Sequence, residues 1–135
     1  MLPKATEKAV NMLAAKNAGF FLMVEGSQID WGGHDNDIDY ITSEVIDFSN
    51  AVEKALAFAK KNKETLVIVT ADHETGGLGL NGGDEQAHTV EAGYTTDYHT
   101  GVMVPVFAFG PGAEEFMGIY DNTDVFKKMK KLLIE

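Results

Sequence analysis

Thr65-Leu66-Val67-Ile68-Val69-Thr70-Ala71-Asp72-His73 is the segment from which the architecture of this chain can be worked out. Residues 65–70 form a β-branched apolar run with the length and composition of a buried strand. The aspartate and histidine that follow are common metal ligands. Another apolar run, at residues 20–24, predicts a strand covered on both faces, and Glu25 follows it directly. Acidic and imidazole side chains therefore stand at the ends of the predicted strands.

Helical patterns alternate with these strands. Apolar residues at helical spacing predict helices over residues 5–17, from about 40 to 61, and from about 123 to 133. Residues 102–109 predict a third strand, whereas residues 26–39 and 74–98 are polar, contain glycine pairs and are predicted to be mainly loop. This order predicts the α/β class, with a sheet layer flanked by helices, in a single domain spanning residues 1–135.

The predicted sheet is mostly parallel, with an antiparallel strand after the long loop. Residues 74–98 contain no crossover helix of the kind that joins parallel neighbours, so the third strand is expected to run antiparallel to the second. That direction brings His99, which precedes the third strand, beside Asp72. Ligands in such sheets gather outside the carboxyl ends of the strands, where Glu25 and Asp72 fall. We therefore expect these side chains to share one edge of the sheet.

The residue types at this edge suit zinc. Asp30 and His34 are four residues apart, close enough to reach one ion if the segment makes a helical turn or a tight loop. With His99 they make a set of one carboxylate and two imidazoles that leaves a coordination position open, as in catalytic zinc sites. The chain has no cysteine, which excludes thiolate zinc sites and disulfides.

A second group of ligands lies at the ends of the first two predicted strands. Asp72 and His73 leave the strand together, so both can turn toward the opening and hold a second ion. Two divalent cations about 4 Å apart would stabilise both the attacking and the leaving oxygens of a phosphoryl transfer. Glu25 offers hard oxygen atoms without a nearby imidazole and better suits magnesium.

Each of these residues also has an ordinary structural interpretation. An Asp-x-x-x-His pair arises by chance, Asp72 can cap a turn, His73 can be a hydrogen-bonded histidine at a strand end, and Glu25 can pair with a lysine. These interpretations hold one residue at a time. They do not explain why all the ligand types fall at one edge of the same predicted sheet.

The charge and hydrophobicity of the chain argue against some classes of binding partner. The net charge of −10 argues against a nucleic-acid partner, because phosphate backbones are bound by clustered Lys and Arg. An anionic substrate would have to be attracted by bound cations. No apolar stretch approaches the roughly 20 residues that span a bilayer, so no membrane partner is expected.

Together the motifs resemble the carboxyl-terminal part of alkaline phosphatases, from about Gly19 to the end. The resemblance rests on Val24-Glu25-Gly26-Ser27-Gln28-Ile29-Asp30 with His34, Thr70-Ala71-Asp72-His73-Glu74-Thr75-Gly76-Gly77, His99-Thr100-Gly101, Val104-Pro105-Val106, Gly110-Pro111 and Asp121-Asn122-Thr123-Asp124. It implies one zinc held by Asp30, His34 and His99, a second held in part by Asp72 and His73, and magnesium held in part by Glu25. It also implies hydrolysis of phosphate monoesters through a phosphoserine intermediate.

The family's nucleophilic serine, its bridging aspartate and its phosphate-binding arginine belong to an amino-terminal part that has no counterpart here. The chain contains no arginine, and its serines, at 27, 43 and 49, lie in unlike contexts. We therefore expect a metal-binding fragment, inactive in isolation, with no catalytic residue of its own. The resemblance implies a periplasmic or secreted parent, and unpaired sheet edges would favour a homodimer. A fragment of a related metal-dependent phosphomutase and a non-catalytic module that binds divalent cations are the alternatives.

Overall fold

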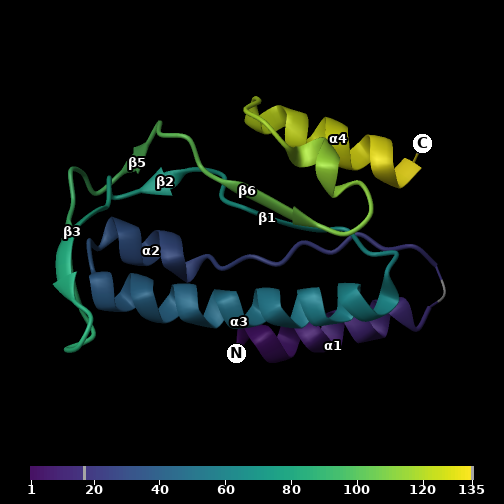
Figure 1. The fold of residues 1–135 in the computed structure, drawn as a ribbon, viewed down its shortest axis with the longest axis horizontal. Coiled ribbons are helices and arrows are strands. Elements are labelled where there is room, and N and C mark those ends of the chain that lie inside the picture. The colour runs from purple at the N-terminus through teal and green to yellow at the C-terminus, as the bar shows by residue number, and fades with distance from the viewer. Residues whose placement is uncertain (17, 135) are drawn as a thin grey trace.

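The computed structural model describes residues 1–16 and 18–134, arranged as helices around short strand pairs (Figure 1). The helices are α1 (Leu2–Ala14), α2 (Gln28–His34), α3 (Ile38–Asn62), α4 (Asn122–Ile134) and the 3-10 turn η1 (Ala113–Phe116). The strands are β1 (Val67–Thr70), β2 (Glu74–Thr75), β3 (Gly79–Asp84), β4 (Thr89–Gly93), β5 (His99–Thr100) and β6 (Val106–Phe109).

The centre of the fold is an antiparallel ribbon of β1 and β6. Val67 pairs with Phe109 and Thr70 with Val106, so the predicted third strand does run against the second. In Figure 1 the ribbon lies between α4 on one side and α3 with α1 on the other, which confirms the α/β class with helices flanking a sheet layer. Helix α3 begins at Ile38, two residues before the predicted start, and it is capped by Asp37, whose side chain accepts a hydrogen bond from Tyr40 N at 3.0 Å.

The expected parallel pairing is absent from residues 1–16 and 18–134, where every strand pair is antiparallel. Residues 20–24, predicted as a strand, join no sheet, although in the view of Figure 1 they run in the same direction as β1. An apolar run shows that a segment is suited to burial, whereas a strand also requires ladder hydrogen bonds to a neighbour. That second condition is not visible in the run itself.

Two predicted loops contain regular structure. Helix α2 forms within residues 26–39 despite Gly32 and Gly33, because both glycines are buried where another part of the chain approaches closely. A β carbon at Gly33 would lie 2.9 Å from Thr75 Cβ, and one at Gly32 would lie 3.0 Å from Ile41 Cγ1. Residues 74–98 contain β2 and the β3–β4 hairpin. Tertiary packing thus outweighs the poor helix propensity of glycine.

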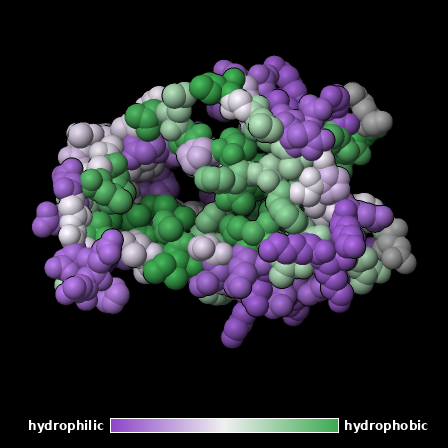
Figure 2. Space-filling view, viewed as in Figure 1, coloured by the Kyte–Doolittle hydropathy of each residue, from purple (hydrophilic) through white to green (hydrophobic). Residues whose placement is uncertain are grey.

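The buried core of the described residues is small. Its apolar members are Val10, Ile41, Ala51, Ala59 and Phe116. The accessible surface is 9716 Å², whereas a compact monomer of this mass exposes roughly 6900 Å². Hydrophobic side chains gather over the middle of the face shown in Figure 2, and Phe107, on the ribbon, is 64% exposed. No described helix combines the length and apolarity needed to cross a bilayer.

Candidate metal centre

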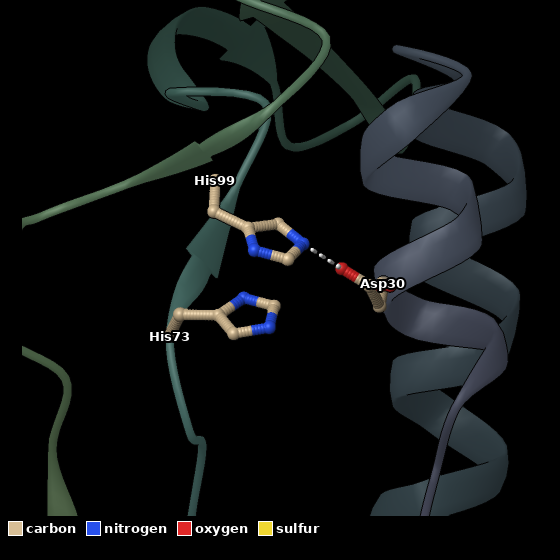
Figure 3. A group of neighbouring side chains, drawn as sticks. All are labelled: Asp30, His73 and His99. Atoms are coloured by element: carbon tan, nitrogen blue, oxygen red, sulfur yellow. Dashed lines mark ion pairs between the residues drawn. The ribbon is translucent and has the colours of Figure 1, made fainter. Parts of the chain in front are cut away.

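Asp30, His34 and His99 converge although they are up to 69 residues apart in sequence. Helix α2 places Asp30 and His34 on one face, one turn apart, with His34 Nε2 3.4 Å from Asp30 Oδ2. Strand β5 brings His99 to the same point: its Nε2 lies 3.6 Å from Asp30 Oδ1 and 3.2 Å from His34 Nε2. Figure 3 shows the Asp30 carboxylate projecting from its helix toward the His99 ring.

These separations fit a single zinc ion. Tetrahedral coordination with bonds of 2.0–2.2 Å places neighbouring ligand atoms roughly 3.3 Å apart. The three observed separations, 3.2, 3.4 and 3.6 Å, are close to that value, with the Asp30 carboxylate facing His34 through Oδ2 and His99 through Oδ1. One carboxylate and two imidazoles are also the donor types that zinc accepts in a catalytic site. The geometry and the chemistry therefore both suit zinc at this point.

His73 lies against the same cluster. Its ring stacks on that of His99 with centroids 3.5 Å apart and planes 19° apart, and Figure 3 shows the two rings side by side. Ligand atoms of Asp30, His73 and His99 all lie within 4.8 Å of one another. Asp72 extends the group outward, because its Oδ2 is 3.3 Å from His73 Nε2 while its side chain is 87% exposed.

Glu25 stands apart from these ligands. It is exposed at the end of residues 20–24, just before α2, and no hydrogen bond or ion pair within the described residues joins it to the cluster. Its role as a magnesium ligand therefore stays a prediction, as do the zinc roles of the other five residues.

Backbone geometry orients the imidazoles. His34 Nδ1 lies 2.6 Å from the carbonyl oxygen of Asp97, which can only accept a hydrogen bond. His34 Nδ1 must therefore carry the proton, which leaves Nε2 free to face Asp30 as a ligand. Strand β5 is aligned by antiparallel pairing with β2, in which His99 lies opposite Thr75. The His34 ring is thus held by a backbone carbonyl, and the His99 ring is positioned by the pairing of β5 with β2.

Glu74 is a supporting residue that the sequence analysis did not identify. Its carboxylate accepts hydrogen bonds from Gly77 N at 3.1 Å, Leu78 N at 3.0 Å and the Thr100 hydroxyl. Burial acts to raise the pKa of Glu74, but these three hydrogen bonds and the charge of His73 together hold that pKa below its ordinary value. The side chain thereby ties the turn after β2 to β5. The feature of the sequence that could have indicated this role is the acidic residue shortly before the glycine pair, in Glu74-Thr75-Gly76-Gly77.

That turn depends on glycine. Gly76 has φ +90° and Gly77 φ +58°, in the left-handed region that other residues rarely adopt. A β carbon at Gly76 would also lie 2.9 Å from the carbonyl oxygen of Gly33. The glycine pair therefore lets the chain reverse tightly between His73 and the β3–β4 hairpin, immediately beside α2.

Known proteins with the same pattern are alkaline phosphatases. The family model described as "Alkaline phosphatase" matches residues 1–90 and 80–134. Alkaline phosphatase 4 of Bacillus subtilis is 36% identical over 200 residues, which cover 96% of this chain and 43% of that protein.

Solved structures give the same result. Alkaline phosphatase from the Antarctic bacterium TAB5 matches with a TM-score of 0.91 and 47% identity, over 98% of this chain and 40% of that one. A mutant of the same enzyme, described with Mg bound in the M3 site, matches with a TM-score of 0.90 and 47% identity, over 98% of this chain and 41% of its own. The chain therefore spans less than half the length of these relatives.

Proposed function

The chain belongs to the alkaline phosphatase family, and on that premise we propose that it supplies the metal-binding part of a phosphate monoester hydrolase. The observation that carries this proposal is the meeting of Asp30, His34 and His99 at separations suited to one zinc ion. The three potential ligands come from two elements that are distant in sequence, α2 and β5, and still lie within 3.6 Å of one another.

The separations between Asp30, His34 and His99 support their assignment to one ion, whereas the assignments of Asp72, His73 and Glu25 are supported by the family resemblance. Asp30, His34 and His99 would hold one zinc, Asp72 and His73 would contribute to a second, and Glu25 would contribute to a magnesium site. Bound cations would supply electrostatic stabilisation of the phosphoryl group and a lowered pKa for bound oxygen nucleophiles. The chain's own residues hold the ligand atoms in place: α2 orients the carboxylate, and the Asp97 carbonyl fixes the proton on His34.

We also propose that these residues alone do not turn over a phosphate ester. Ser43 and Ser49 are exposed on α3, and Ser43 Oγ donates to the carbonyl oxygen of Tyr40. No arginine is present to bind a phosphate. A non-catalytic module that binds divalent cations is the second candidate, and the lack of an arginine and of a serine in the expected context favours it.

The test combines turnover with metal uptake. The chain is incubated with zinc, magnesium and p-nitrophenyl phosphate, and zinc binding is measured in parallel by competition with a chromophoric chelator. We expect the wild-type chain to take up zinc but to hydrolyse the ester no faster than His99→Ala. We also expect His99→Ala to lose more zinc affinity than the roughly 10–100-fold lost when a residue that only hydrogen-bonds to a ligand is removed. His88→Ala, which removes an exposed histidine of the β3–β4 turn, is the matched control.

Two outcomes would contradict the proposal. Turnover at the rate of ordinary phosphatases would refute the inactivity of these residues. Equal zinc affinity in the wild-type chain and His99→Ala would refute the ligand assignment.

Location and assembly follow from the family and remain proposals. A periplasmic or secreted parent, and a homodimer formed through unpaired sheet edges, are expected of an enzyme of this kind. Extracellular fractionation and sedimentation of the purified protein test them.

A further inference from the structure

Thr75, on β2, lies between two groups of proposed ligands. Its hydroxyl donates to Asp30 Oδ1 at 2.5 Å, and its Oγ1 is 3.3 Å from Nδ1 of His73. The side chain is half-buried, and its Cβ and Cγ2 face Gly33 of α2. One hydroxyl therefore contacts a carboxylate of the first proposed zinc set and an imidazole of the second.

The number of protons at this point determines the direction of both hydrogen bonds. An ionised carboxylate only accepts, so the single hydroxyl proton of Thr75 is used toward Asp30. The contact with His73 must then run the other way, with Nδ1–H donating to a lone pair of Thr75 Oγ1. A neutral imidazole carries one N–H, so Nε2 of His73 is left with its lone pair free.

The nitrogen left without a proton faces the Asp72 carboxylate, which in the absence of a cation competes with Thr75 for the ring proton. His73 Nε2 is the atom that lies 3.3 Å from Asp72 Oδ2. The same hydroxyl also restrains the carboxylate of Asp30, whose other oxygen faces His34 at 3.4 Å. We propose that Thr75 is a positioning residue that fixes the Nδ1–H tautomer of His73 and the orientation of Asp30, and so couples the two proposed cation sites through one hydroxyl.

This inference rests on the proposed metal-binding function, but its first consequence can be measured without metal. His34 serves as an internal control, because its Nδ1 proton is held by the Asp97 carbonyl, independently of Thr75. Loss of the Thr75 hydroxyl should release the tautomer of His73 and leave that of His34 unchanged.

The variants are chosen to separate the hydroxyl from its packing. Thr75→Val keeps a branched side chain against Gly33 and removes the hydroxyl, whereas Thr75→Ser keeps the hydroxyl. Thr70→Val is the matched control: the Thr70 hydroxyl, at the end of β1, bonds to the carbonyl oxygens of Ala71 and Pro105. Circular dichroism of each variant verifies that it is folded.

Long-range ¹H–¹⁵N NMR of the metal-free chain at about pH 8.5, where imidazoles are neutral, reports the tautomer of each histidine. We expect His73 to be the Nδ1–H tautomer in the wild-type chain, Thr75→Ser and Thr70→Val, and to shift toward Nε2–H in Thr75→Val. An unchanged His73 tautomer in Thr75→Val, or a wild-type His73 already in the Nε2–H form, would overturn the proposal.

Cobalt titration, read from its visible absorption, tests the coupling. We expect Thr75→Val to bind Co²⁺ roughly 10–100-fold more weakly, as for loss of other outer-shell partners, and Thr75→Ser to bind within a few-fold of wild type. If His99→Ala weakens cobalt binding and Thr75→Val does not, the coupling is wrong and the proposed metal site stands. If neither variant changes cobalt binding, the proposed site fails, and with it the coupling, whatever the tautomer.

Discussion

Gly33→Ala tests how closely α2 must approach β2 to form the site. The added methyl carbon would lie 2.9 Å from Cβ, 3.0 Å from Cγ2 and 3.1 Å from the carbonyl oxygen of Thr75. Distances near 3 Å are too short for carbon, and one of the three atoms belongs to the backbone. The substitution therefore requires α2 and β2 to separate.

The expected magnitude is a balance of two effects. Overpacking of a close contact costs about 1–3 kcal/mol. Alanine in a helix interior gains about 1 kcal/mol over glycine. The free energy of unfolding should thus fall by roughly 0–2 kcal/mol. The effect on metal binding should be greater, because α2 carries Asp30 and His34, and a site of this kind tolerates displacements of only about 0.5 Å.

The assays are urea unfolding followed by circular dichroism and zinc binding by chelator competition. We expect zinc affinity to fall at least about 10-fold, in line with disturbed supporting contacts. Gly19→Ala is the control, since a β carbon there meets nothing within 4 Å, and should leave both measurements unchanged. A Gly33→Ala chain that is more stable than wild type and binds zinc equally well would refute the close approach of α2 to β2.

Two further perturbations address the support of the site and its dependence on metal. The pKa of Glu74 is lowered on folding, so its stabilising effect is present above its ordinary pKa of 4.5 and is lost as the pH falls through the lower folded value. Glu74→Gln should therefore cost about 1 kcal/mol at pH 7. The difference, measured by urea unfolding across pH, should shrink as the pH falls below 4.5, and a difference that grows on acidification would refute this. At a free zinc concentration about 100 times the dissociation constant, bound zinc should raise the free energy of unfolding by about 2.7 kcal/mol, and a chelator should remove this gain. Thermal melts that coincide with and without zinc would argue against zinc binding to the folded chain.

The part of the fold that the sequence predicts is the part governed by local pattern and by connection rules. Helix α3 and strand β1 follow from apolar periodicity and β-branched composition. The direction of β6 follows from the missing crossover helix, and this direction also explains why His99 lies against His73, which follows β1. These elements and the direction of this strand pair can therefore be predicted from the sequence alone.

The remainder depends on contacts that no local pattern shows. Helix α2 has an unfavourable glycine pair, and it forms where Gly33 can approach Thr75 and Gly32 can approach Ile41. The supporting roles of Glu74 and Thr75 likewise need coordinates, because each depends on a partner at least 26 residues away. Residues 20–24 are predicted as a strand from their apolar character, but they form none, because a strand also needs a neighbouring strand with which to pair.

Anomalous diffraction at the zinc edge, from crystals of this protein grown with zinc, tests the central claim most directly. We expect a single peak that lies about 2 Å from Nε2 of His34, from Nε2 of His99 and from one oxygen of Asp30. Zinc found only at other surface residues, with these three side chains uncoordinated, would contradict it.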